Sequence, residues 1–380
     1  MTRIVIDENI SFAEEAFSSL GEVRLLHGRK IDRSALKDAD ALVIRSITNA
    51  DEDLLKGTPV KFVGTATIGT DHVDEDYLRE KEIAFSSAKG CNADAVAEYV
   101  FTAILTIAKE KGIVLKGKTL GVIGVGNIGS RAARFGKSLG MEVLLNDPPL
   151  KRQTKSSEFI SLEEALKCDI VTFHVPLNME GEDRTYHLLN EENLKLIKKG
   201  AIVINASRGQ VIDNRAFPEF LNYRPDVSAV LDVWENEPSI NSKLLEKVSI
   251  ASPHIAGYSL EGKVNGTIMI RDAFCSFLKC SSSYKPVLPE VEESVIEADG
   301  NASMETILFN VFTKVYNIKE DDRLMRRIPE LLPEEKGFYF DELRKHYRLR
   351  REFSNYSVKL NPFNKALAEV LKTFRFNINL

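Results

Sequence analysis

Cysteine is scarce in this sequence, and no two cysteines stand at the spacing of a metal site. Cys91, Cys168, Cys275 and Cys280 are scattered, with no Cys-x-x-Cys motif and no histidine nearby at metal-ligand spacing. In a chain without secretory features, buried thiols are more common than disulfides. We therefore expect neither a bound metal ion nor a disulfide bond.

Long apolar runs, a signal peptide and an excess of positive charge are also missing. No run of about 18 apolar residues occurs, and the apolar stretch at residues 4–6 is too short for a signal peptide. With 51 basic and 56 acidic residues, the formal net charge is −5, which gives no bulk attraction to nucleic acid or to anionic membranes. We expect a cytoplasmic protein that binds neither, and that holds any anionic substrate in a local pocket.

The pattern of apolar residues predicts an α/β fold with more than one domain. A chain of 380 residues exceeds the size at which one hydrophobic core keeps growing. Short β-branched runs alternate with helical stretches, as in βαβ units with a parallel sheet. The expected strands are 3–6, 22–26, 41–44, 62–65 and 83–86, followed by 119–123, 142–146, 170–173, 201–205, 228–231 and 248–251. A helix over 92–109 bridges the two series, and Ser161 with Glu164 predicts a capping box.

The composition changes after about residue 285. Pro286, Pro289 and the acidic run at 290–293 are typical of a linker. Asn361 and Pro362 are then expected to open a helix. Its apolar stripe would be Phe363, Leu367, Val370, Leu371 and Phe374. A tail of about 90 residues with its own apolar faces predicts a third, small module.

A glycine motif after one expected strand predicts a dinucleotide site. Residues 124–129 read Gly-Val-Gly-Asn-Ile-Gly, directly after the strand at 119–123 and before a helical stripe. Gly124 permits a tight turn, Gly126 lets a pyrophosphate approach the backbone, and Gly129 lets helix and strand pack closely. Asp147 ends the next strand, where a carboxylate binds ribose hydroxyls and repels a 2′-phosphate. We therefore expect NAD rather than NADP.

Three polar side chains at or beyond strand ends suit hydride transfer from an alcohol next to a carboxylate. Arg208 offers a planar fork that can pair with the substrate carboxylate. His254 titrates near neutrality and can take the hydroxyl proton. Glu237 can bond the other ring nitrogen of His254 and favour the imidazolium form. Because parallel strands end at one edge of a sheet, these three residues form a candidate catalytic set.

Four motifs carry a resemblance to a known enzyme family. They are Gly124 to Gly129 with Asp147, Ser207-Arg208-Gly209, Glu237-Pro238 and Ser252-Pro253-His254. Together they resemble the D-2-hydroxyacid dehydrogenase family over roughly residues 1–280. The resemblance implies two Rossmann-like, doubly wound parallel-sheet domains, with Arg208, Glu237 and His254 as the catalytic set. The positions it assigns to NAD are Gly124, Gly126, Asn127, Ile128, Gly129, Asp147, Val175, Ala206, Ser207, Arg208, Asp232 and Gly257.

Longer matching stretches are similar to members of the family that oxidise 4-phosphoerythronate in vitamin B6 biosynthesis. The stretches are 5–9, 45–46, 63–74, 90–92 and 254–263. They imply a small phosphorylated 2-hydroxy acid as substrate, in a pocket lined by Ser46, Thr67, Tyr258 and Arg45. They also imply that the tail is a small α+β dimerisation domain and that the protein is a homodimer. The expected domains are a discontinuous, flavodoxin-like substrate domain at 1–93 and 257–285, an NAD-binding Rossmann domain at 94–256, and the dimerisation domain at 286–380.

Other functions remain open at this point. 3-Phosphoglycerate, one carbon shorter, is the alternative substrate, because pocket length cannot be read from sequence. An NAD-sensing corepressor on the same fold would bind dinucleotide without chemistry, but the intact catalytic set argues against it. The basic run 344–351 could contact nucleic acid, yet Asp341, Glu342 and Glu352 favour a solvated helix face. His72 and His174, also near strand ends, are assigned structural or supporting roles.

Overall fold

Contacts divide the chain into two compact units. The computed structural model describes residues 1–281 and 283–379, and its first unit comprises Met1–Asn92 with Ser259–Glu290. The second unit comprises Ala93–Tyr258 with Val291–Leu380. The expected boundary between an NAD-binding domain at 94–256 and a tail at 286–380 therefore falls inside the second unit. In the described part of the chain, no helix is both long and apolar enough to cross a membrane.

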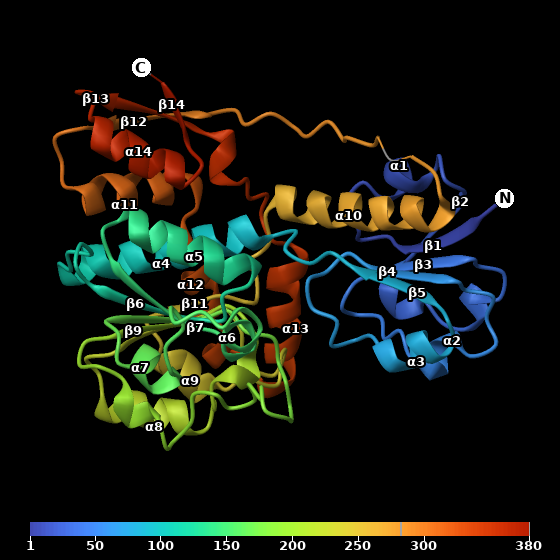
Figure 1. Cartoon of the computed structure of the whole chain (residues 1–380), viewed down its shortest axis with the longest axis horizontal. Helices are drawn as coiled ribbons and strands as arrows, with labels where there is room; N and C mark the ends of the chain where they lie inside the picture. Colours follow the sequence, from blue (N-terminus) through green and yellow to red (C-terminus); the bar gives the residue numbers. More distant parts are fainter. Residues whose placement is uncertain (282, 380) are drawn as a thin grey trace. The chain divides into compact units, whose positions relative to one another are not determined.

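The first unit is built on a five-stranded parallel sheet. Its strands are β1 Arg3–Asp7, β2 Glu22–Leu26, β3 Ala41–Ile44, β4 Phe62–Thr65 and β5 Ala84–Ser87. Their order, β2-β1-β3-β4-β5, is that of flavodoxin-like sheets. Helices α1 Ala13–Phe17 and α10 Leu260–Leu278 cover one face, and α2 Glu52–Leu55 and α3 Glu75–Glu80 cover the other (Figure 1). Each strand lies within one residue of its predicted position, and the return of the chain as α10 makes this unit discontinuous in sequence.

The second unit contains a six-stranded parallel sheet that positions the site. Its strands are β6 Thr119–Ile123, β7 Glu142–Asn146, β8 Ile170–Phe173, β9 Ile202–Asn205, β10 Ser228–Leu231 and β11 Ile250–Ala251. The order is β11-β10-β9-β8-β6-β7. The chain thus adds β7 on one side of β6 and the strands from β8 to β11 on the other side. Ligands of open α/β sheets bind at such a switch point. Strand β11 is shorter than the predicted 248–251, because the Val248 amide closes the last turn of α9 on the Leu244 carbonyl.

Helices cover both faces of this sheet, and one of them is buried on nearly all sides. Helices α4 Ala93–Lys111 and α5 Asn127–Ser138 lie on one face, and α7 Leu162–Leu166, α8 Ala216–Tyr223 and α9 Ser242–Lys247 on the other (Figure 1). The predicted capping box of α7 is present, and α6 spans Pro148–Thr154. Helix α4, predicted to carry one apolar stripe, is buried almost all round, because α11 packs against it as well.

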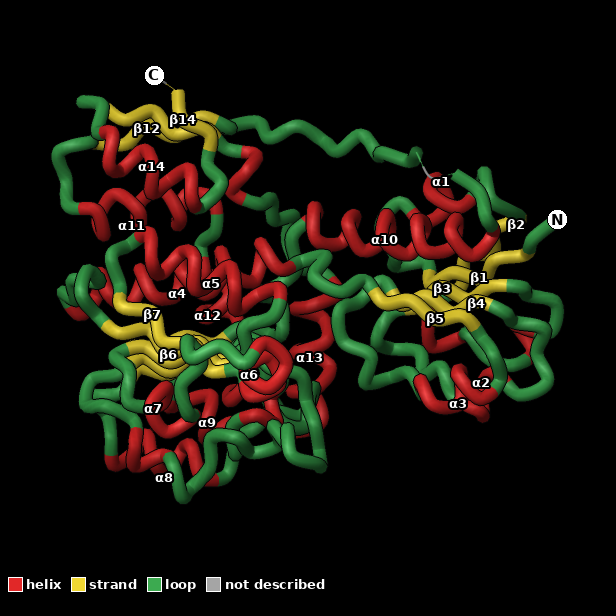
Figure 2. Tube along the Cα trace, viewed as in Figure 1, coloured by secondary structure: helices red, strands yellow, loops and turns green. Residues whose placement is uncertain are grey.

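The C-terminal part adds a second layer of helices and a small parallel sheet. The order of its strands is β12-β13-β14, with β12 Val295–Asp299, β13 Ser357–Asn361 and β14 Asn377–Asn379. Helices α11 Met304–Val315 and α14 Lys365–Thr373 separate this sheet from α4 and α5 (Figure 2). Helices α12 Ile318–Met325 and α13 Pro333–Lys345 complete the tail. Aromatic rings bind the layers together, since Phe374 contacts both Phe101 of α4 and Phe135 of α5.

Two expectations for the tail are wrong. The last helix begins at Lys365 rather than at 361–362, because Asn361 ends β13 and the Asn364 side chain caps the helix by accepting from the Leu367 amide. Phe363 is consequently exposed instead of belonging to the apolar stripe. The basic run at 344–351 does not form a solvated helix face either, since α13 ends at Lys345 and Arg350 and Arg351 are buried.

A buried carboxyl group on α4 makes stability depend on pH. Glu98 is fully buried, and its carboxyl group accepts a hydrogen bond from the Phe353 amide at 3.0 Å. Burial, followed by the neighbouring Glu352 charge, raises the pKa of Glu98 well above its usual range, although Arg350 and Arg375 oppose the shift. The folded chain thus keeps a proton that the unfolded chain loses above about pH 4.3. Stability therefore falls as pH rises from there through the folded pKa.

Replacing Glu98 with glutamine, which keeps the acceptor oxygen, should make the protein less sensitive to alkaline pH. Relative to the wild type, the free energy of unfolding of Glu98→Gln is expected to rise by up to about 1.4 kcal/mol per pH unit inside that window. Urea unfolding of both proteins at several values between pH 5 and 9 measures the difference. A difference that stays constant over this range would show that Glu98 is ionised in the folded protein.

Candidate active site

The glycine loop after β6 has the shape that a dinucleotide requires. Gly124 has φ +85°, and a Cβ there would lie 2.5 Å from the His174 carbonyl oxygen. A Cβ on Gly129 would lie 1.9 Å from the Gly124 oxygen, so helix and strand touch at this point. Gly126 differs, because a Cβ there would meet nothing within 4 Å. The loop is therefore tight where it packs and open where a pyrophosphate would approach the first amides of α5.

Asp147 and Val175 lie beside this loop. The Asp147 carboxylate accepts hydrogen bonds from the Val125 amide at 2.8 Å and from the Leu150 amide at 3.0 Å. Val175 follows β8, and its side chain lies 2.9 Å from the place of a Cβ on Gly124. These positions border the switch point between β6 and β8. The preceding residue, His174, is neutral, since burial lowers its pKa to about 3.

Glu237 and His254 form a direct pair. The Glu237 carboxylate lies 2.8 Å from His254 Nδ1 and also accepts the Trp234 amide at 2.8 Å. Burial opposes ionisation of Glu237, but the His254 charge and hydrogen bond outweigh it and lower the Glu237 pKa. The backbone of His254 has φ +58°, a conformation of sparsely populated type that concentrates at functional sites. The His254 side chain is partly exposed and its Nδ1 is held by Glu237, so Nε2 can be offered to a substrate.

A buried aspartate fixes the loop that carries His254. Asp232 follows β10 and is 1% exposed. Its carboxylate accepts hydrogen bonds from the Ser252 hydroxyl at 2.5 Å and from the amides of Ile255 and Ala256 at 2.8 and 2.9 Å. Sequence reasoning assigned Asp232 only to NAD binding. Its contacts give it a second task, because three hydrogen bonds to one carboxylate hold the His254 loop rigidly.

The turn after β9 carries Arg208 and lies against the segment that follows β10. Asn205 organises this turn by accepting from the Ser207 amide and hydroxyl and by donating to the Arg208 carbonyl. A Cβ on Gly209 would lie 2.0 Å from the carbonyl carbon and oxygen of Trp234. Only glycine therefore allows the Arg208 turn to pack against the segment that leads to Glu237. The loops after β9, β10 and β11 are thus joined by direct contacts.

Comparison with known proteins agrees with this geometry. The D-isomer specific 2-hydroxyacid dehydrogenase NAD binding domain matches residues 100–256, and a domain of unknown function, DUF3410, matches residues 287–374. Erythronate-4-phosphate dehydrogenase of Proteus mirabilis (strain HI4320) is 46% identical and covers 99% of both chains. This chain belongs to the D-isomer-specific 2-hydroxyacid dehydrogenase family. The predicted fold class, the NAD cofactor and the assignment as an NAD-dependent dehydrogenase are confirmed.

Other members of the family differ in how much of the chain they cover. Erythronate-4-phosphate dehydrogenase of Pseudomonas syringae pv. tomato is 42% identical, over 97% of this chain and 98% of its own. The crystal structure of D-lactate dehydrogenase from Aquifex aeolicus, complexed with NAD and lactic acid, has a TM-score of 0.62 at 29% identity. It covers 73% of this chain and 96% of its own. The fold of this D-lactate dehydrogenase thus accounts for about three quarters of the present chain.

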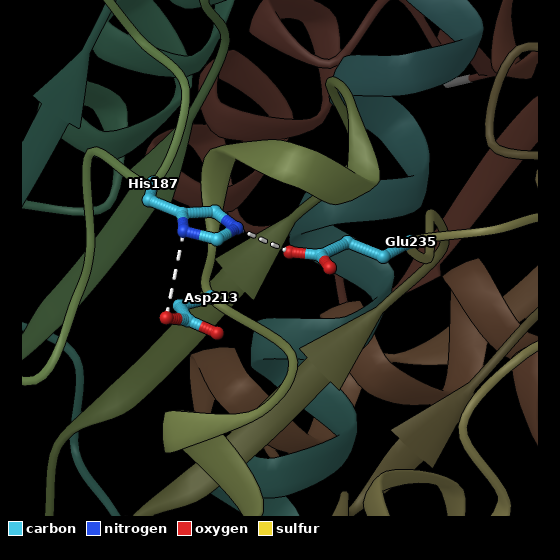
Figure 3. Close-up of side chains that lie close together, drawn as sticks. All are labelled: His187, Asp213 and Glu235. Atoms are coloured by element: carbon cyan, nitrogen blue, oxygen red, sulfur yellow. Dashed lines mark hydrogen bonds and ion pairs between the residues drawn. The ribbon is translucent and has the colours of Figure 1, made fainter.

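A second histidine of this dehydrogenase lies between two carboxylates. His187 Nε2 is 2.7 Å from Glu235 and Nδ1 is 3.4 Å from Asp213 (Figure 3). Among residues 1–281 and 283–379, this is the one group of such side chains close enough to consider for a metal ion. Each ring nitrogen faces a different carboxylate, however, which is the arrangement of a histidine that links two acids. Because Glu235 shares a loop with Glu237, His187 supports the position of Glu237.

The first unit holds the other expected substrate residues at the carboxyl ends of its strands. Arg45 and Ser46 follow β3, where Arg45 lies 3.5 Å from the Asn9 carbonyl. Thr67 follows β4 and contacts the Thr65 hydroxyl at 2.7 Å. His72 also bonds Thr65, at 2.9 Å, in agreement with a supporting role. Arg45, Ser46 and Thr67 belong to the first unit, whereas the candidate catalytic residues belong to the second.

Sequence reasoning missed two cations near the expected substrate residues. Lys263 of α10 is exposed, but desolvation by its surroundings, followed by the Arg45 charge, lowers its pKa. It lay in a matching stretch but carried no assigned role. Arg344 of α13 donates to the Tyr258 hydroxyl at 3.2 Å. It was grouped with the basic run 344–351, so only its position in the fold distinguishes it.

Proposed function

We propose that this enzyme oxidises 4-phospho-D-erythronate to 3-hydroxy-2-oxo-4-phosphooxybutanoate with NAD, a step of vitamin B6 biosynthesis. The observation that carries the proposal is the paired Glu237 and His254 at 2.8 Å, on loops joined to the Arg208 turn, in a chain whose full-length relatives are erythronate-4-phosphate dehydrogenases. The proposal takes Arg208, Glu237 and His254 as catalytic set. It also places the reaction in the cytoplasm.

The residues divide the work of oxidising a hydroxyl next to a carboxylate. Arg208 pairs with the substrate carboxylate and polarises the developing carbonyl. His254 takes the C2 hydroxyl proton on Nε2 while Glu237, bonded to Nδ1, holds the ring and stabilises its positive charge. Bound NAD supplies the acceptor for the hydride that leaves C2. The glycine loop and Asp147 hold the dinucleotide, and Ser46, Thr67, Tyr258 and Arg45 contact the substrate.

A direct comparison of substrates tests the proposal. The purified enzyme is assayed with 4-phosphoerythronate and with 3-phosphoglycerate, following the nicotinamide absorbance in both directions. We expect kcat/KM to favour 4-phosphoerythronate by about tenfold or more, since one carbon unit in a fitted pocket is worth about 10- to 200-fold. A preference for 3-phosphoglycerate would make that acid the substrate in place of 4-phosphoerythronate. NAD binding without turnover of either acid would favour the alternative function of a dinucleotide sensor.

Asp147 should determine the choice between the two dinucleotides. Asp147→Ser combined with Pro148→Arg removes the carboxylate and adds a cation for the 2′-phosphate of NADP. Because hydrogen bonds to a charged group contribute about 1.5 to 3 kcal/mol, kcat/KM with NAD should fall about ten- to hundredfold while that with NADP rises. Steady-state kinetics with both cofactors measures the change. A wild-type enzyme that already prefers NADP contradicts the role given to Asp147.

We also propose that the enzyme is a homodimer through residues 286–380. Several large apolar side chains of this segment are exposed in a single chain and suit a protein interface. They are Val295, Leu332, Phe338, Leu349 and Phe363, each more than half exposed. Removing the segment would uncover α4, so point changes give the cleaner test. Analytical ultracentrifugation should show a dimer for the wild type and for Tyr223→Lys, a control on α8, but dissociation for Phe338→Lys with Leu349→Lys. A monomeric wild type excludes the proposal.

A further inference from the structure

The C-terminal part of the chain sends one side chain to the active-site residues of its own unit. Arg344 lies near the end of α13, and its Nη2 donates to the Tyr258 hydroxyl at 3.2 Å. The guanidinium carbon lies 5.9 Å from the centre of the Tyr258 ring. Tyr258 is four residues beyond His254 in the sequence. A residue of the tail therefore contacts the segment that carries the catalytic histidine.

The guanidinium of Arg344 is close enough to Glu237 for their charges to interact. Burial opposes the charge of Arg344, yet Tyr258 and Glu237 raise its pKa, and Arg344 in turn is one of the groups that lower the Glu237 pKa. Arg344 Nε is buried and has no hydrogen-bond partner among the described residues. A buried donor of a charged group that lacks a protein partner is costly. An oxygen-rich anion at this position would satisfy it.

The chemistry of the proposed substrate indicates which anion this is. The proposed reaction assigns the substrate carboxylate to Arg208, on the turn after β9. 4-Phosphoerythronate carries a second anionic group, the phosphate, and a guanidinium fork matches phosphate oxygens. Tyr258, already expected to contact the substrate, is the residue that Arg344 touches. We propose that Arg344 binds the phosphate group of the substrate, so that α13 completes the substrate site. The inference rests on the proposed function.

Two substitutions of Arg344 test it. Arg344→Met removes the cation and keeps the bulk of the stem, whereas Arg344→Lys keeps the charge without the fork. With 4-phosphoerythronate, KM should rise about ten- to hundredfold in Arg344→Met and by less in Arg344→Lys, because a charge-assisted bidentate contact is lost in full or in part. With unphosphorylated erythronate, kcat/KM should change less than threefold. Lys345→Met, an exposed neighbour on α13, is the matched control and should match the wild type.

A second readout does not depend on turnover. Inorganic phosphate should compete with 4-phosphoerythronate in the wild type and in Lys345→Met, and its inhibition constant should rise at least tenfold in Arg344→Met. The dissociation constant for NAD, measured by fluorescence, should be the same in all proteins. If Arg344→Met fails to fold, the same measurements are made on Arg344→Lys.

The outcomes separate this inference from the function on which it rests. Equal losses of kcat/KM with erythronate and with 4-phosphoerythronate would mean that Arg344 acts only through Tyr258 and Glu237, and would overturn phosphate binding. Unchanged kinetics in both variants would overturn it as well. A wild type that turns over neither phosphorylated acid would contradict the proposed function instead. Phosphate binding by Arg344 could then still be measured, as inhibition by phosphate of the turnover of another hydroxy acid with NAD.

Discussion

Replacing His254 with alanine is expected to lower kcat by about 10² to 10⁴, the range that a positioned general base contributes. In the proposed function the glycine loop and Asp147 hold the dinucleotide, so the dissociation constant for NAD should change less than threefold. Stopped-flow measurement of the chemical step, together with titration of NAD by fluorescence, checks both statements. A variant that keeps more than a tenth of the wild-type kcat would show that another group takes the hydroxyl proton.

The Glu237→Gln variant tests how the glutamate acts on His254. Glu237→Gln keeps the shape of the side chain but removes the negative charge that lies 2.8 Å from His254 Nδ1. Oxidation needs neutral His254 and loses rate toward acid pH, whereas reduction needs protonated His254 and loses rate toward alkaline pH. Both limbs should therefore move to lower pH in Glu237→Gln. pH profiles of kcat/KM in the two directions measure this, and limbs that stay in place would mean that the pair is not coupled.

The same variant has a defined effect on stability. A carboxyl group whose pKa is lowered on folding stabilises the protein above its unfolded pKa, about 4.3, and loses that contribution as pH falls through the folded value. The wild type should thus exceed Glu237→Gln in free energy of unfolding near pH 7, and the difference should shrink toward pH 3.

Arg350→Met should cause the largest loss of stability. Arg350 is 3% exposed, donates to the carbonyls of Ala256 and Ala95 at 3.0 and 2.7 Å, and lies 4.0 Å from the centre of the Tyr316 ring. Removing one member of a buried charged network costs about 3 to 5 kcal/mol, since its partners lose their hydrogen bonds. The midpoint of urea unfolding at pH 7 measures the loss.

The exposed Arg323 of α12 supplies the matched control, and Arg323→Met should stay within about 0.5 kcal/mol of the wild type. Because Arg350 holds Ala256, next to the loop of His254, kcat should fall as well, even where Arg350→Met is still folded. Equal stability of the two variants would contradict the importance of this buried contact.

Local patterns in the sequence were sufficient for the sheets and the cofactor loop. All eleven strands of the two large sheets were located, because buried parallel strands are short β-branched runs between turn residues. The glycine motif was also informative, because a Cβ on Gly124 or Gly129 would clash with backbone that is close in the sequence or that follows the adjacent strand β8. The pairing of Glu237 with His254 followed from their places after adjacent strands, β10 and β11.

Contacts between distant segments could not be predicted in this way. Arg344 and Arg350 stand in a run of basic residues whose pattern is that of a surface, and only packing against residues near 95 and 256 buries Arg350. Asp232 was assigned one role because its three bonds to the His254 loop depend on the geometry of two strand ends. The strands of the small sheet escaped notice, since β12 is largely exposed and β14 is both short and exposed.

Helix α4, covered on one side by the six-stranded sheet and on the other by α11, has a consequence for synthesis of the protein. Its last residue, Lys111, and the first residue of α11, Met304, are separated by 193 positions (304 minus 111). A ribosome that adds about 5 to 20 residues per second needs roughly 10 to 40 seconds to span that interval. During this time the side of α4 that α11 covers in the folded protein has no covering helix. Nascent chains of this length are therefore expected to need chaperone protection until α11 has emerged.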